Sequence, residues 1–199
     1  MTVSLRKKPE ARCSGCLMRH ESCLCGAIPR LLLETRLVLI TRSRELKSPS
    51  NTGRLALLAL SNSEGLVRGD RNRPYDLKGS LLPNRPSLLL YADPEAPVLD
   101  RSLRDLGPYN LIVPDGNWRQ THKLRRRDPD LLNVPCVRLP PDRPSAYRIR
   151  HDSKAEGLAT LEAIARALGV LEGPQVEAEL TTLFELQVTS ILRSRGSNS

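Results

Sequence analysis

Short apolar runs constrain the fold of this chain more than any other feature of its sequence. Three of them occupy residues 37–40, 87–91 and 111–113, and a fourth, at residues 135–139, is broken by an arginine. The runs lack the polar alternation of a half-exposed strand, so each is typical of a strand covered on both faces. Strands of that kind belong to a parallel sheet.

Segments with helical patterns lie between these runs or follow them, at residues 51–60, 95–106, 118–127, 160–171 and 174–195. A Ser-Pro-Ser stretch can cap the first segment. Thr160 is a candidate N-cap for the fourth, which Gly173 and Pro174 end. The last segment carries an apolar stripe, made of Val176, Leu180, Leu183, Phe184, Val188 and Ile191. Alternating strands and helices predict an α/β fold with a mostly parallel sheet.

The chain is expected to divide near residue 30. Residues 1–30 combine a basic arm with a cysteine-rich lobe, and residues 31–199 have the size and texture of one larger domain. The N-terminus has no apolar core of a secretory signal. No stretch approaches the roughly 18 apolar residues of a spanning helix. A soluble, cytoplasmic protein is therefore expected, with no membrane partner.

Four of the five cysteines, Cys13, Cys16, Cys23 and Cys25, lie within thirteen residues. Four thiolates at short spacing satisfy tetrahedral zinc, and a fully occupied ligand set is typical of a structural site. A disulfide framework is disfavoured because cytosolic thiols stay reduced. An iron–sulfur cluster stays open, and so does a zinc site in which His20 replaces one cysteine. The fifth cysteine, Cys136, is expected to be a small buried residue.

The chain is basic, with a formal net charge of +9. A basic surplus favours polyanionic partners, and the arginines that dominate it suit phosphate. Charge alone does not decide between RNA, DNA, a membrane surface and simple solubility. Aromatic residues make up only 3% of the chain, so few rings are available for stacking on bases.

Asp115 directly follows the apolar run at residues 111–113 and the proline after it. The carboxyl ends of parallel strands open onto the ligand crevice of an α/β protein. Gly116 permits a tight turn beside a ligand, and Trp118 is the only tryptophan. A purely structural interpretation makes Asp115 a helix N-cap and Trp118 a core residue, with no site here.

Residues 113–124, which contain Asp115-Gly116-Asn117-Trp118, resemble the signature of the DTW-domain family. The family is named after Asp, Thr and Trp, and this chain has Asn117 at the Thr position. Further segments resemble the family in order along the chain: the cysteine cluster, residues 50–55, residues 145–150 and residues 158–165. The ordered set, spanning about residues 12–172, is more specific than any one segment.

The resemblance implies a SPOUT-like domain with a C-terminal trefoil knot. It also implies a tRNA-uridine aminocarboxypropyltransferase, which moves the 3-amino-3-carboxypropyl group of S-adenosylmethionine to N3 of a uridine and releases 5'-methylthioadenosine. Asp115, Asn117 and Trp118 would form the catalytic motif, with Asp115 as the base. A monomer is expected, and a dimer stays open.

The resemblance and the expected strand ends together predict two sets of binding residues. The cofactor would be held by Tyr91, Pro114, Gly116, Leu139, Ser145, Tyr147, Arg150, Thr160 and Glu162. Within this set, Arg150 and the start of the helix at Thr160 are candidates for the donor carboxylate. RNA would be held by Asn51, Thr52, Arg54, Lys123, Arg125, Arg126 and Arg127. The basic cluster beside Trp118 could equally be a solvated helix face.

Two further functions stay open. One is a SPOUT-like RNA methyltransferase that uses the same cofactor and releases S-adenosylhomocysteine. The second is a zinc-stabilised RNA-binding module without catalysis, which the Thr-to-Asn difference at Asn117 would permit.

Overall fold

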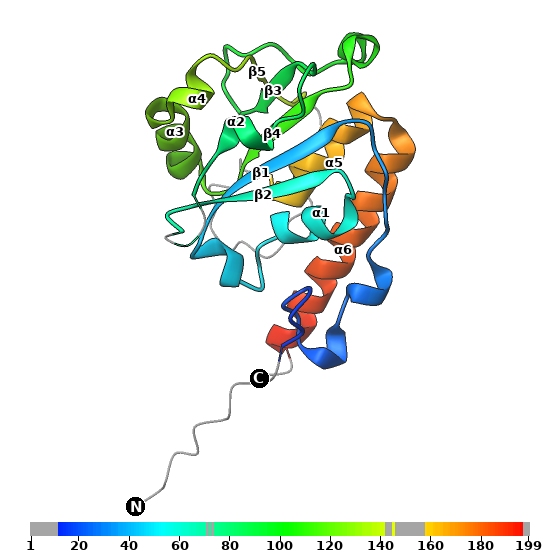
Figure 1. The fold of residues 1–199 in the computed structure, drawn as a ribbon. Helices are drawn as coiled ribbons and strands as arrows, with labels where there is room; N and C mark the ends of the chain where they lie inside the picture. The colour runs from blue at the N-terminus through cyan, green and yellow to red at the C-terminus, as the bar shows by residue number, and fades with distance from the viewer. Residues whose placement is uncertain (1–11, 71, 73, 142–144, 146–157, 197–199) are drawn as a thin grey trace, which may run out of the picture.

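The computed structural model describes residues 12–70, 72, 74–141, 145 and 158–196. Its centre is a sheet of β1 (Arg36–Arg42), β2 (Ser63–Arg68), β3 (Ser87–Leu90), β4 (Asn110–Pro114) and β5 (Cys136–Val137). The order across the sheet is β2-β1-β4-β3-β5, and every pairing is parallel (Figure 1). The predicted α/β fold with a parallel sheet is confirmed.

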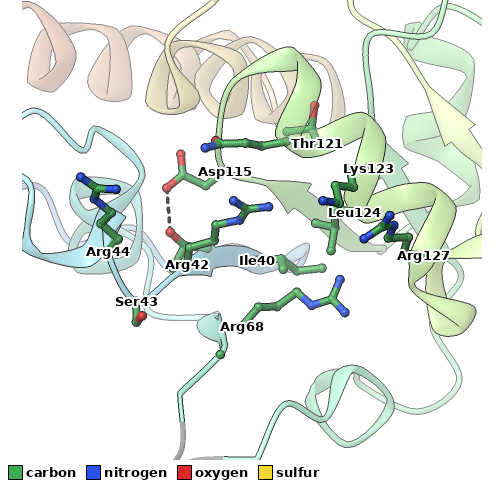
Figure 2. A pocket seen from close by; sticks show the side chains of 13 residues that line it. Ile40, Arg42, Ser43, Arg44, Arg68, Asp115, Thr121, Lys123, Leu124 and Arg127 are labelled. Carbon is green, nitrogen blue, oxygen red and sulfur yellow. Dashed lines mark hydrogen bonds between the residues drawn. The ribbon is translucent and has the colours of Figure 1, made fainter.

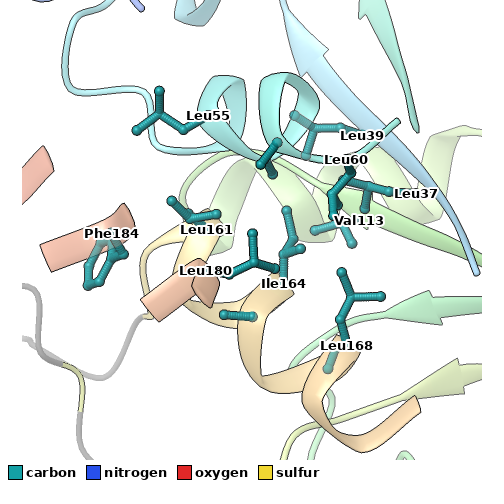
Figure 3. Close-up of a cluster of buried hydrophobic side chains, with 14 of the residues drawn as sticks. Leu37, Leu39, Leu55, Leu60, Val113, Leu161, Ile164, Leu168, Leu180 and Phe184 are labelled. Carbon is teal, nitrogen blue, oxygen red and sulfur yellow. The ribbon is translucent and has the colours of Figure 1, made fainter. Parts of the chain in front are cut away.

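One face of the sheet packs against α1 (Gly53–Ala59), α5 (Thr160–Leu171) and α6 (Pro174–Gly196). Leu37 and Leu39 of β1 meet Leu161 and Ile164 of α5 in this cluster (Figure 3). The predicted stripe of α6 supplies buried side chains such as Phe184. This face holds the larger part of the core.

The other face packs against α2 (Leu77–Ser80), α3 (Trp118–Arg127) and α4 (Pro129–Leu132). Val38 and Ile40 of β1 and Ile112 of β4 point to this side and are at most 1% exposed. Neighbouring residues along one strand are thus buried on opposite faces. This explains why the sequence of these strands is apolar without alternation.

The predicted helices at 118–127 and 160–171 have the bounds of α3 and α5. The helix predicted at 95–106 is wrong for its first half, since only the 3₁₀ helix η4 (Arg101–Leu106) forms. Thr160 is the first residue of α5, and Ala159 is its N-cap. The run at 135–139 contributes a strand of only two residues, β5.

The edge strand β2 was not predicted. Its sequence mixes polar and apolar residues, and Leu66 alone is buried in it. An edge strand has one neighbour and more contact with solvent, so it needs no apolar run. It pairs with β1 from Leu37 opposite Ser63 to Arg42 opposite Arg68, and this pairing is set by the tertiary structure and not by the local sequence.

The cysteine-rich lobe contains the 3₁₀ helices η1 (His20–Ser22) and η2 (Cys25–Ala27). It is joined to the domain, since Cys16, Met18 and Leu24 belong to the core cluster of the first face. Arg54 of α1 also donates to the backbone oxygens of Ser14 and Gly15, at 2.8 and 2.5 Å. The division near residue 30 stays a prediction.

None of the helices in the described part of the chain is long and apolar enough to cross a membrane. The expected trefoil knot lies in the C-terminal part of the domain, where residues 142–144 and 146–157 fall outside the described residues. The knot therefore stays a prediction as well.

Candidate active site at Asp115

Asp115 lies at the carboxyl end of β4, the middle strand of the sheet. Its backbone N–H donates to the carbonyl of Ile40 in β1 over 2.8 Å. This bond continues the register in which Ile40 faces Pro114, so Asp115 sits opposite the end of β1. The strand end predicted from the sequence is thus the centre of a sheet edge.

Among the described residues, three side chains donate hydrogen bonds to the Asp115 carboxylate. Thr41 Oγ1 and Asn51 Nδ2 donate to Oδ2, at 3.0 and 2.6 Å. Thr160 Oγ1 donates to Oδ1, at 2.6 Å. A carboxylate has about four acceptor positions, so three donors fix its orientation and leave room for one more partner.

The three donors come from separate elements: β1, the loop before α1 and the first turn of α5. Asn51 was expected to bind RNA and Thr160 to bind the cofactor, and the side chains of both donate hydrogen bonds to Asp115. Thr41 was not predicted. A signal existed, because Thr41 is the one polar residue within the apolar part of β1, and it is 1% exposed.

Asn117 is the N-cap of α3. Its side chain accepts from the backbone N–H of Gln120, and the Gln120 side chain accepts from the backbone N–H of Asn117, each over 3.0 Å. Thr and Asn are both favoured N-caps. The cap that the structural interpretation assigned to Asp115 is therefore formed by Asn117, in a role that a threonine can also fill.

Gly116 makes the turn between Asp115 and the cap. Its φ is +152°, and a Cβ there would lie 2.6 Å from Oε1 of Gln120. A side chain at this position would strain the backbone and collide with the capping box. Of the tryptophan in the motif, Trp118, the structure describes the helical backbone and not the side chain.

The expected cofactor residues are only partly within the described residues, since Tyr147 and Arg150 lie outside them. Glu162 is 6% exposed and accepts from Ser145 Oγ at 2.6 Å and from Arg166 at 2.9 Å. Pro114 is buried in β4, and Leu139 packs against the main core. Glu162 thus forms a buried ion pair.

Tyr91, at the end of β3, is buried, and burial raises the pKa of its hydroxyl. The hydroxyl lies 2.9 Å from Nδ1 of His122. Arg125 stacks over the Tyr91 ring at 5.2 Å and pairs with Asp93 at 2.7 Å. Arg125, which was expected to bind RNA, thus has its partners within the protein. The same holds for two other residues expected to bind RNA. Arg54 donates to a backbone carbonyl of the cysteine-rich lobe, and the Thr52 hydroxyl accepts from the backbone N–H of Leu161.

A cleft of about 460 Å³ opens beside Asp115, at the ends of β1 and β2 and along α3 (Figure 2). Lys123 and Arg127, predicted to bind RNA, line it. It also receives Arg42, Arg44 and Arg68, which the sequence did not single out because they are far from the motif. Arg126, although exposed on the same helix, does not line it.

The four clustered cysteines bring their Sγ atoms within 4.8 Å of one another. Two pairs, Cys13–Cys25 and Cys16–Cys23, lie 3.5 and 3.7 Å apart. These distances exceed a disulfide bond of about 2.05 Å. They are close to the separation of about 3.8 Å between two sulfur ligands that each lie about 2.3 Å from a tetrahedral zinc ion.

The contacts within the cluster shift the pKa values of its cysteines in opposite directions. Hydrogen bonds from the backbone of Cys16 and from the Cys25 thiol hold the pKa of Cys13 down, at about 6. The hydrogen bond to Cys13 in turn raises the pKa of Cys25 to about 12. The pKa of Cys13 is thus shifted toward the thiolate form and that of Cys25 toward the thiol form.

The DTW domain model matches residues 10–192 of the chain. Two relatives are each called tRNA-uridine aminocarboxypropyltransferase 2, from Drosophila melanogaster and Macaca fascicularis. Both are 28% identical to this chain, over 81% and 84% of its length. The matches span 66% and 58% of those longer proteins.

A solved structure supports the fold. It is the SAM-dependent rRNA:acp-transferase Tsr3 from Vulcanisaeta distributa, with a TM-score of 0.56 and 19% sequence identity. The likeness covers 81% of this chain and 80% of that one.

Proposed function

The chain belongs to the DTW domain family, and from that premise we propose that it is a tRNA-uridine aminocarboxypropyltransferase. The donor would be S-adenosylmethionine, and the product would be a uridine with a 3-amino-3-carboxypropyl group on N3. The names of the relatives support the reaction, although the chain spans only part of their length. The single observation that carries the assignment to a site is the Asp115 carboxylate, held by three donors at the sheet edge.

The chemistry that Asp115 must perform is proton removal. Uridine N3 carries a hydrogen, which leaves as N3 forms its new bond to carbon. The carbon–sulfur bond of the donor breaks, and its electron pair leaves with 5'-methylthioadenosine. Asp115 would accept the proton at the acceptor position that Thr41, Asn51 and Thr160 leave open, provided that N3–H lies within hydrogen-bond reach.

The cofactor would lie on the β4–β3–β5 side of Asp115. Three of the residues expected to hold it follow these neighbouring strands: Tyr91 after β3, Gly116 after β4 and Leu139 after β5. Ligands of open α/β sheets bind outside the carboxyl ends of such strands. S-adenosylmethionine would supply there a carbon activated by the neighbouring sulfonium.

The cysteine cluster would hold a structural zinc ion. The four sulfur ligands fill a tetrahedral set, which leaves no position for a substrate. The cluster is fixed to α1 through Arg54, three residues after Asn51. A metal there would stabilise the segment that presents Asn51 to Asp115.

The test is incubation of tRNA with the protein and with S-adenosylmethionine labelled in its methionine chain. Nucleoside mass spectrometry should find label on uridine, with methylthioadenosine as coproduct. Asp115→Asn should lower turnover about 10²- to 10⁴-fold, which is typical of a lost general base. S-adenosylhomocysteine as coproduct would instead identify a methyltransferase. RNA binding without any cofactor binding would identify a non-catalytic module.

A further inference from the structure

The cleft beside Asp115 is strongly cationic. Among the described residues, its wall contains five cations and one carboxylate, Asp115 itself. The cations are Arg42, Arg44, Arg68, Lys123 and Arg127. In Figure 2, Arg44 lies at the left of the cleft, Lys123 and Arg127 at the right and Arg68 below, with Asp115 between Arg44 and Lys123.

Within the part of the chain that the structure describes, most of this charge is not neutralised by carboxylates. Among the described residues, no carboxylate forms an ion pair with Arg42, Arg44, Lys123 or Arg127. Asp115 is itself occupied by one amide and two hydroxyl donors. Like charges gathered on a concave surface repel one another, so the arrangement is stabilised when an anion enters.

Arg68 differs from the other four because its position is fixed. It lies 3.5 Å from the buried carboxylate of Asp128 and 5.1 Å above the ring of Tyr75. These contacts hold the guanidinium along one wall before any ligand arrives. A preorganised arginine loses less freedom when it binds phosphate.

The cleft occupies one half of the sheet edge. Most of its residues lie at or just after the carboxyl ends of β1 and β2 or project from α3. Three residues expected at the cofactor, Tyr91, Gly116 and Leu139, follow β3, β4 and β5 instead. Asp115, at the end of the middle strand β4, borders both halves. A substrate that enters through the cationic half would therefore reach the carboxylate from the side opposite Tyr91 and Leu139.

We propose that this cleft is a phosphate-binding subsite that holds the RNA backbone at the nucleotide to be modified, so that its base faces Asp115. The inference rests on the proposed function for the identity of that base. A volume of about 460 Å³ suits one nucleotide with its flanking phosphates better than a single carboxylate, since ligand pockets of roughly 300–1,000 Å³ hold whole small molecules. Arginine forks on several sides match phosphate oxygens.

The first experiment measures binding by calorimetry without cofactor, using uridine 3',5'-bisphosphate, uridine and inorganic phosphate as probes. The bisphosphate should bind at least about tenfold more tightly than either other probe. Arg44→Gln and Arg127→Gln, on opposite walls, should each weaken it about tenfold, the usual scale of a lost charged hydrogen bond. Arg119→Gln, which removes an exposed cation of α3 outside the cleft, should leave it unchanged.

Several results would overturn the proposal. Uridine binding as tightly as the bisphosphate would show that phosphate is not recognised. Inorganic phosphate binding as tightly as the bisphosphate would show a free-anion site. If Arg119→Gln and Arg127→Gln weaken bisphosphate binding equally, the effect comes from the net charge of the protein and not from contacts in the cleft. Arg127→Lys, which keeps the charge, should retain more affinity than Arg127→Gln, and circular dichroism checks that each variant folds.

The second experiment separates this proposal from the proposed function. With tRNA as substrate, Arg44→Gln and Arg127→Gln should raise KM and leave kcat nearly unchanged. Each should also reduce the slope of log affinity against log salt by about 0.7 per lost single-strand phosphate contact. Transfer with unchanged KM and unchanged bisphosphate affinity in both variants would defeat the subsite alone. Bisphosphate binding that is sensitive to both variants, without any transfer to tRNA, would defeat the proposed function alone.

Discussion

The hydroxyl of Thr160 donates to Oδ1 of Asp115 over 2.6 Å, and so connects the first turn of α5 to the end of β4. The two residues are 45 positions apart in the chain. The contact makes the orientation of the carboxylate depend on the packing of α5 against the sheet. Thr41 and Asn51 hold the other carboxylate oxygen in the same manner from β1 and from the loop before α1.

Thr160→Val should lower kcat for uridine modification about 10- to 100-fold with little change in KM. Valine keeps the shape of threonine and removes the donor, so Asp115 loses a charge-assisted hydrogen bond that fixes its orientation. Release of methylthioadenosine measures the effect. Thr160→Ser, which keeps the hydroxyl, should retain most of the activity, and a valine variant as active as the unchanged protein would contradict the positioning role.

Asn117→Thr should leave the free energy of unfolding and the transfer rate nearly unchanged. Threonine is a good N-cap, so the helix start of α3 survives the exchange. Asn117→Ala should cost about 1 kcal/mol, since the backbone N–H of Gln120 loses its side-chain acceptor. Urea denaturation measures both variants. If the threonine variant is as unstable as the alanine variant, Asn117 has a role beyond capping.

Gly116→Ala should destabilise the protein by about 1–3 kcal/mol, the usual scale for a side chain forced into a disfavoured backbone conformation. The new methyl would also meet Oε1 of Gln120 and disturb the capping box. Thermal unfolding measures the loss. Gly26→Ala is a matched control, because a Cβ there meets nothing within 4 Å, and the prediction fails if the two alanine variants melt alike.

Glu162→Gln and Arg166→Met should each lower stability, by at most the roughly 3–5 kcal/mol of a broken buried ion pair, because either change removes one charge of the pair. The side chains of the pair are 8% and 11% exposed and lie 2.9 Å apart. The double variant should recover part of the loss in a double-mutant cycle by urea denaturation. Additive losses would show that the pair is not coupled.

Removal of metal should destabilise the cysteine-rich lobe. We expect about one zinc ion per chain by elemental analysis, and a lower melting temperature after treatment with a chelator. Cys16→Ser should bind zinc more weakly, whereas Cys136→Ser, outside the cluster, should keep the metal. Reduced protein that contains no zinc, or that melts at the same temperature with and without chelator, would refute the site.

The sequence by itself determined the class of fold and the position of Asp115 at the end of a strand. Strands that are buried on both faces are mostly apolar, so β1, β3 and β4 could be predicted from local apolar runs in the sequence. The four cysteines are close in the chain, so their clustering could be predicted from their spacing. Asp115 could be placed at a strand end because that position depends only on the local sequence.

The tertiary structure decided which residues surround Asp115. Thr41 lies 74 positions before it and reaches it because β1 pairs with β4 in a register that sets Ile40 opposite Pro114. Arg68 joins Arg127 in the cleft because β2, a strand without an apolar signature, pairs with β1. Which strands become neighbours depends on burial summed over the whole core, and no local pattern records that sum.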